Sequence, residues 1–151
     1  MRVSAIKKIL VPIDGSAASL KAHHLALEAA AAFGAEVILL YVVDSSALDE
    51  ISRLSGRDRP RLLHDMQESG MKLLMSLSRE AEKRGLAARV DIQTGMPDEV
   101  ILEEANRHQA SLIVMGKIGR KGHRRSLLGS VTERVLEASD IPVLVVSPAG
   151  E

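Results

Sequence analysis

Glycines and basic side chains gather in one segment of this chain. Residues 116–129 hold four glycines and five basic side chains with no acidic residue among them, and Gly129-Ser130-Val131-Thr132 then opens a helical pattern. Glycines let backbone N–H groups converge on one spot, and a helix N-terminus carries unpaired N–H groups and the positive end of a dipole. Both features favour an anion such as phosphate. A solvated loop after a strand would have a similar composition, so the residues alone leave these two interpretations open.

The spacing within this segment excludes the common phosphate motifs. A Walker A loop needs a glycine five residues before its Gly-Lys pair, and that position is Ser111. No G-x-G-x-x-G follows the first apolar run of the chain. These two absences argue against a P-loop motor and against a Rossmann dehydrogenase.

Metal and catalytic sites find little support in the other residues. His23 and His24 are adjacent on a predicted helix, so they point about 100° apart and cannot easily share a metal. The other histidines are His64, His108 and His123, and none of them has a second histidine at the spacing of a metal-binding motif such as H-E-x-x-H. The chain has no cysteine and no G-x-S-x-G nucleophile motif. We therefore predict no catalytic residue and no metal site built from protein side chains.

Short apolar runs alternate with helical patterns along the chain. The runs predict strands at 8–13, 36–43, 88–93, 111–115 and 141–146. Most of them lack a two-residue alternation, as parallel strands covered on both faces do, but 88–93 alternates apolar and polar residues and is predicted at a sheet edge. Caps and breakers predict helices from Ser16 to Phe33, near 61–84, from Pro97 to near His108 and over 130–138, with 44–59 as a surface excursion.

This alternation predicts an α/β fold with right-handed crossovers and an open, doubly wound parallel sheet that carries helices on both faces. In such sheets, ligands bind outside the carboxyl ends of the strands, where the strand order reverses. Two segments of unusual composition follow strands in this way, Pro12–Ser16 and residues 116–129. We therefore expect them to meet in one ligand site.

Composition sets limits on the class of protein. The chain has 151 residues, which suits one domain over 1–151, and its 20 basic and 20 acidic residues cancel. Zero net charge and the near absence of aromatic residues make nucleic-acid binding an unfavoured interpretation. The apolar run near the N-terminus is too short for a signal or a membrane span, so the sequence predicts a cytoplasmic protein without a membrane partner.

Several motifs together resemble the universal stress protein family. The central one is Met115-Gly116-x2-Gly119-x9-Gly129-Ser130, which resembles the nucleotide-binding signature of that family. The resemblance also includes Ile9–Ser16, Gly34–Val37, Tyr41–Val43, Gly95-x-Pro97 and Ile141–Val146, so it spans nearly the whole chain. Each piece is weak alone, but their shared spacing makes a strong match.

The resemblance implies a fold and a mode of assembly. It implies a five-stranded parallel sheet in the order 3-2-1-4-5, Rossmann-like and of the adenine nucleotide alpha hydrolase type. It also implies a homodimer that pairs through the last strand, at 142–146. An apolar strand left unpaired at an edge would be an aggregation risk, which favours the same arrangement.

The resemblance also implies a bound adenine nucleotide, ATP with Mg²⁺ or Mn²⁺ held by its phosphates. Asp14 would bind the adenosine portion, with Pro12 and Val42 beside the adenine. Gly116 and Gly119 would let the loop pass close to the ribose and the α-phosphate. The outer phosphates would meet the helix start, and the implied set is completed by Gly129, Ser130, Thr132, Met115 and Val131.

Physical reasons accompany these roles, and each has a structural alternative. At Gly119 and Gly129 a Cβ could collide with phosphate or require a strained backbone. Ser130 is a natural helix cap and Asp14 a natural turn residue before Gly15, so both could be purely structural. The position after Gly116 is often a small hydroxyl residue in the family but is Lys117 here, which would add charge near a phosphate or crowd the loop.

The sequence thus favours an ATP-binding regulatory protein of the universal stress type, which acts through nucleotide-dependent conformation or assembly. Two alternatives stay open. One is an enzyme with weak ATP hydrolysis or autophosphorylation, since slow turnover needs only bound Mg-ATP and water. The other is a dimeric interaction module that does not bind nucleotide.

Overall fold

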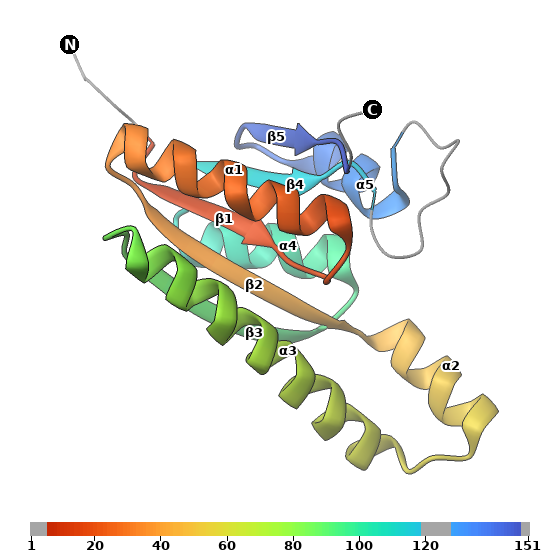
Figure 1. The fold of residues 1–151 in the computed structure, drawn as a ribbon. Helices are drawn as coiled ribbons and strands as arrows, with labels where there is room; N and C mark the ends of the chain where they lie inside the picture. The colour runs from red at the N-terminus through yellow and green to blue at the C-terminus, as the bar shows by residue number, and fades with distance from the viewer. Residues whose placement is uncertain (1–5, 119–127, 149–151) are drawn as a thin grey trace.

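A five-stranded parallel sheet forms the centre of the molecule, in the order β3-β2-β1-β4-β5 (Figure 1). The computed structural model describes residues 6–118 and 128–148. The strands are β1 (Lys8–Pro12), β2 (Glu36–Asp44), β3 (Ala88–Gly95), β4 (Leu112–Gly116) and β5 (Val143–Val146). The predicted fold class and strand order are confirmed, as is the prediction that the alternating run at 88–93 lies at an edge.

Helices cover both faces of this sheet. On one face lie α1 (Ala17–Phe33) and α3 (Arg59–Lys83), and on the other lie α4 (Pro97–Arg107) and α5 (Ser130–Ala138) (Figure 1). These helices match the predicted ones closely because their caps could be read from the sequence. For example, Ser16 accepts a hydrogen bond from the Ser19 N–H at 3.1 Å, and Gly34 ends α1 in the left-handed conformation with φ of 70°.

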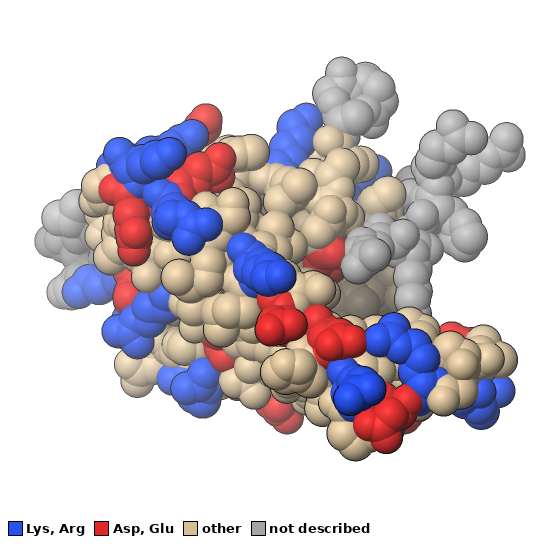
Figure 2. Space-filling model, turned by 60° about the horizontal axis from the view of Figure 1, so that its bottom comes forward, with Lys and Arg blue, Asp and Glu red and all other residues tan. Residues whose placement is uncertain are grey.

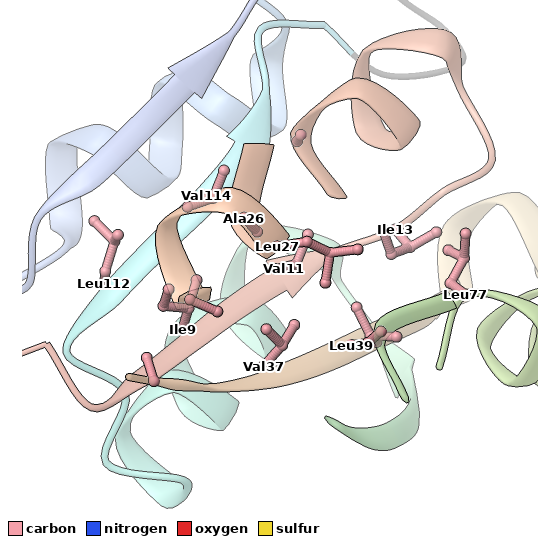
Figure 3. Close-up of a cluster of buried hydrophobic side chains, with 14 of the residues drawn as sticks. Ile9, Val11, Ile13, Ala26, Leu27, Val37, Leu39, Leu77, Leu112 and Val114 are labelled. Atoms are coloured by element: carbon pink, nitrogen blue, oxygen red, sulfur yellow. The ribbon is translucent and has the colours of Figure 1, made fainter. Parts of the chain in front are cut away.

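Alternate residues of the strands fill two apolar layers. Ile9 and Val11 of β1 belong to the apolar layer that also contains Leu27 of α1 and Leu77 of α3 (Figure 3). Leu10 between them points to the opposite layer, with residues of α4 and α5. Burial on both faces explains why the central strands read as continuous apolar runs.

The predicted surface excursion at 44–59 is largely a helix, α2 (Ser45–Ser55). Asp44 caps it, because its carboxylate accepts the N–H groups of Ser46 at 3.0 Å and Ala47 at 3.3 Å. Gly56 ends it with φ of 72°. Together with the start of α3, this helix extends beyond the end of the sheet (Figure 1). We call residues 45–69 the arm.

Charged side chains of both signs intermingle on the face shown in Figure 2. Two arginines of the arm segment are paired, Arg57 with Asp65 at 2.8 Å and Arg59 with Asp49 at 2.7 Å. Within residues 6–118 and 128–148, no helix is both long enough and apolar enough to cross a membrane.

His23 is a buried polar residue in the layer between α1 and α3. Its Nε2 lies 3.0 Å from Glu80 Oε1, while its Nδ1 has no hydrogen-bond partner among the described residues. Burial lowers the pKa of His23 below its ordinary 6.5, although the hydrogen bond to Glu80 acts in the opposite direction. The unfolded chain therefore binds a proton here more readily than the folded chain does.

This lowered pKa predicts an acid-sensitive stability. The contribution of His23 is fully present above pH 6.5 and declines as the pH falls from 6.5 toward the pKa of the folded state. We expect His23→Leu to remove this part of the pH dependence, measured by urea unfolding from pH 7.5 to pH 5.5. The matched control is His64→Gln, since the His64 side chain is 71% exposed. Equal slopes in wild type and His23→Leu would contradict the prediction.

Candidate functional site

A pocket of about 920 Å³ opens at the carboxyl ends of β1, β2 and β4. It lies where the strand order reverses, because β1 pairs with β2 on one side and with β4 on the other. Every predicted site residue in the described part of the chain lines it: Pro12, Asp14, Val42, Met115, Gly116, Gly129, Ser130, Val131 and Thr132. Gly119 falls outside the described residues. The two segments of unusual composition therefore do meet at one site.

The turn after β1 is held by Asp14 itself. Its Oδ1 accepts the N–H of Ser16 at 2.9 Å, and Gly15 between them has φ of 85°, which favours glycine. The hydroxyl of Ser19 accepts the Asp14 N–H at 3.3 Å. Asp14 therefore has a structural role as a turn residue and also presents its side chain to the pocket.

Gly116 and Thr132 join the end of β4 to the start of α5. The Thr132 hydroxyl is buried and donates its only proton to the Gly116 carbonyl at 2.8 Å. This hydrogen bond joins the start of α5 to the end of β4. A Cβ at Gly116 would lie 2.7 Å from the Cβ of Ala18 in α1, so a glycine here is required for the close packing of β4 against α1.

The glycine segment is closed at its base by two hydrogen bonds. The Gly129 N–H donates to the Lys117 carbonyl at 2.9 Å, and the Lys117 N–H donates to the Val146 carbonyl at 2.7 Å. Gly129 has φ of −70° and ψ of 157°, an ordinary extended conformation, so of the two reasons given for a glycine here only a collision of its Cβ with phosphate stays open. The Lys117 side chain lies outside the pocket lining, and Ile118 contributes to the lining instead.

The start of α5 presents backbone donors to the pocket. Gly129, not Ser130, is the N-cap of α5, and it offers no side-chain acceptor. The first N–H groups of a helix have no partner within it, which here are those of Ser130, Val131 and Thr132. In contrast, α1, α2 and α3 are capped by Ser16, Asp44 and Asp58. An anion at α5 would therefore meet uncommitted donors and a favourable dipole.

The opposite wall of the pocket is more apolar and includes residues that the sequence analysis missed. The arm supplies Ala47, Ile51, Leu62 and Met66, and the start of α4 supplies Met96 and Pro97. The spacing of Leu48, Ile51 and Leu54 behind a potential cap at Asp44 was the signal for this wall. The pocket thus joins an apolar cleft to a helix N-terminus.

A second group of polar residues lies behind β3, away from this pocket. Ligand atoms of Asp91, Glu104 and His108 lie within 4.8 Å of one another. The exposed Arg107 donates to both carboxylates and lies 3.1 Å from His108 Nε2, so a positive charge already occupies the centre of the group. The arrangement is an ion-pair network that fastens α4 to the edge strand.

Burial and hydrogen bonding act differently on the two carboxyls of this network. Burial acts to raise the pKa of Asp91, but hydrogen bonds from Glu104 and His108 outweigh it and lower the pKa. Burial raises the pKa of Glu104, and Asp91 adds to the rise. Asp91 is only 8% exposed, although it belongs to the edge strand β3.

Comparison with known proteins connects this architecture to one family. The sequence profile described as Universal stress protein family matches residues 5–147. A universal stress protein of Methanocaldococcus jannaschii is 40% identical over 141 residues, which is 93% of this chain and 81% of the relative. The solved structure of MJ0577, another universal stress protein of that organism, has a TM-score of 0.84 at 30% identity and covers 98% of this chain and 100% of that one.

A further solved structure is that of a universal stress protein in complex with cAMP. It has a TM-score of 0.65 at 26% identity, with 97% of this chain and 100% of that chain covered. The family profile and the first relative each extend over more than nine-tenths of the present sequence. This chain belongs to the universal stress protein family.

Proposed function

We propose that this chain binds an adenine nucleotide in the pocket at the carboxyl edge of the sheet and acts as a regulatory stress-response protein. The ligand is ATP, with Mg²⁺ or Mn²⁺ held by the phosphates. The observation that carries the proposal is the continuity of an apolar cleft with the uncapped start of α5. A nucleotide joins a flat aromatic base, whose faces pack against apolar groups, to an anionic phosphate chain.

The described residues divide the work of binding in this proposal. The base lies against Pro12, Val42 and Met115, and the phosphates reach the N–H groups at Ser130 and Val131. A carboxylate has about four acceptor sites, so Asp14 can hold its turn and also accept hydrogen bonds from ribose hydroxyls. Thr132 acts indirectly, since its hydrogen bond to Gly116 fixes where α5 begins.

Two independent facts support adenylate over other anions. A structural relative at 26% identity is described in complex with cAMP. The glycine spacing at 116, 119 and 129 is also intact in this chain. Nucleotide binding at this site would provide a nucleotide-dependent change of conformation or assembly.

Gly129→Val tests the proposal. A branched side chain at the N-cap of α5 would stand where a phosphate must approach the first N–H groups. We expect the dissociation constant for Mg-ATP to rise by about tenfold or more, which is about 1.4 kcal/mol. Isothermal titration calorimetry measures this, with the melting temperature as a check on folding.

The matched control is Lys117→Ala, at the base of the same segment. Its side chain lies outside the pocket lining, so the affinity should stay close to that of wild type. Unchanged binding in Gly129→Val would remove the start of α5 from the site, and no saturable binding in wild type would reject the proposed function.

We also propose that the chain forms a homodimer through strand β5. Leu144 in this strand is 40% exposed, and Leu136 of α5 is 39% exposed. An unpaired apolar edge of this kind invites association with a second copy. Sedimentation equilibrium should give twice the chain mass for wild type and a monomer for Leu144→Asp; a monomeric wild type would contradict the arrangement.

A further inference from the structure

Two opposite charges lie at the same pocket and belong to different helices. Asp98 is in the first turn of α4, and Arg134 is in the second turn of α5; both line the pocket. The Nη1 atom of Arg134 lies 4.0 Å from Oδ1 of Asp98. The two helices pack against each other on one face of the sheet, so the pair spans their starts (Figure 1).

This pair is longer than the other arginine–carboxylate pairs among the described residues. Arg89 and Glu36 lie 2.7 Å apart, and Arg57 is held by Asp65 at 2.8 Å, both within the range of a charge-assisted hydrogen bond. At 4.0 Å, Arg134 and Asp98 attract each other without such a bond. The Arg134 side chain is 58% exposed, so it can turn to a new partner at little cost.

The position of Arg134 on α5 brings it near the proposed phosphate site. It follows Ser130 by four residues, so both lie on the same face of the helix. Side chains on a helix lean toward its N-terminus, which here is the end with unpaired N–H groups. An anion at the start of α5 is therefore within the direction in which Arg134 extends.

The described pocket lining contains more acidic than basic side chains, so Asp98 and Arg134 have a large influence on how it receives an anion. Among the described lining residues, the acidic ones are Asp14, Asp44, Asp65 and Asp98, and the basic ones are Arg57 and Arg134. Arg57 is already paired on the arm. Arg134 is thus the basic side chain of the described lining that lacks a close partner, while Asp98 lies beside it and repels an incoming anion.

We infer that Asp98 and Arg134 set the affinity of the pocket according to the phosphate charge of its ligand. Arg134 leaves Asp98 to pair with the phosphates of a bound adenylate, and Asp98 weakens the binding of those same phosphates. This inference rests on the proposed function and extends it to the class of ligand. It predicts that adenylates with more phosphate charge bind more tightly. It also predicts that this preference depends on the side chains of Asp98 and Arg134.

The test is a comparison of ATP, AMP and adenosine by isothermal titration calorimetry at constant ionic strength, without divalent cations. We expect Arg134→Gln to weaken ATP binding by about tenfold, because it removes a hydrogen bond to a charged group. The same variant should weaken AMP binding less and leave adenosine binding unchanged. Arg134→Lys should retain much of the affinity for ATP. Asp98→Asn should change the affinity in the opposite direction and strengthen ATP binding by about threefold.

Glu133→Gln is the matched control, because it removes a negative charge from the same helix outside the pocket lining. It should leave the ratio of ATP to adenosine affinity near that of wild type. Equal changes for ATP and adenosine in Arg134→Gln would show a merely structural role and overturn the inference, as would no change in either variant. If wild type binds none of the three ligands, the proposed function itself fails and takes the inference with it.

Discussion

Gly116→Val should destabilise the fold by about 3 kcal/mol, at the upper end of the cost of overpacking. A Cβ at this position would lie 2.7 Å from the Ala18 Cβ, 2.9 Å from the Ala18 carbonyl carbon and 3.0 Å from the Ser19 nitrogen. Two of these three atoms are backbone, so no rotamer change relieves the clash. Moving β4 from α1 would also disturb the Gly116 carbonyl that accepts the Thr132 proton.

Thermal unfolding followed by circular dichroism measures this effect, and a fall in melting temperature of about 10 °C is expected. Ala18→Gly in the same chain provides the control, because it removes the nearest atom but leaves the backbone contacts. The double variant should regain part of the loss. If Gly116→Val had the same melting temperature as wild type, this prediction would be wrong, and α1 and β4 would be able to move apart at little cost.

Leu48→Ala should release α2 from the body of the protein. Leu48 is fully buried, and it is the buried residue of α2, packed with Val43 and Leu62. Truncating a buried leucine costs about 2–5 kcal/mol, and here the loss falls on one helix of eleven residues. We expect amide hydrogen exchange to accelerate strongly over 45–55 while the protection of β1 persists.

Leu54→Ala is the matched control for this prediction, since it makes the same change on the same helix where the side chain is 72% exposed. It should leave exchange near that of wild type. Because Ala47 and Ile51 form part of the pocket wall, Leu48→Ala should also weaken nucleotide binding. Equal protection of α2 in the two variants would mean that contacts other than Leu48 hold the arm.

Local patterns were sufficient to predict most of the fold. Continuous apolar runs follow from strands buried on both faces, and Gly34, Pro60 and Pro97 mark helix ends whatever lies around them. The arm was missed because most residues of α2 are polar or charged, although Leu48, Ile51 and Leu54 recur at helical spacing. What places Leu48 is contact with residues of β2 and α3, which no local pattern reveals.

The location of the site was easier to predict than the role of each residue within it. Carboxyl ends of parallel strands must meet, so Asp14 and Gly129 could be assigned to one pocket. In contrast, the Thr132 hydroxyl is engaged by Gly116, sixteen residues away, and sequence spacing gives no indication of that bond. Asp91 is likewise paired with Arg107 and His108 at the end of α4, and the alternation of residues along β3 does not indicate those partners.

The two hydrogen bonds at the base of the glycine segment affect how the sequence of this protein can evolve. Gly129 is bonded to Lys117, and Lys117 is bonded to Val146 of β5, so both ends of the segment are anchored to the sheet by backbone hydrogen bonds. For loops in general, each doubling of the length adds only about 0.6 kcal/mol to the entropic cost of closing the loop. The segment between these two residues can therefore change in length or composition during evolution, to suit a new ligand, while α5 keeps its position.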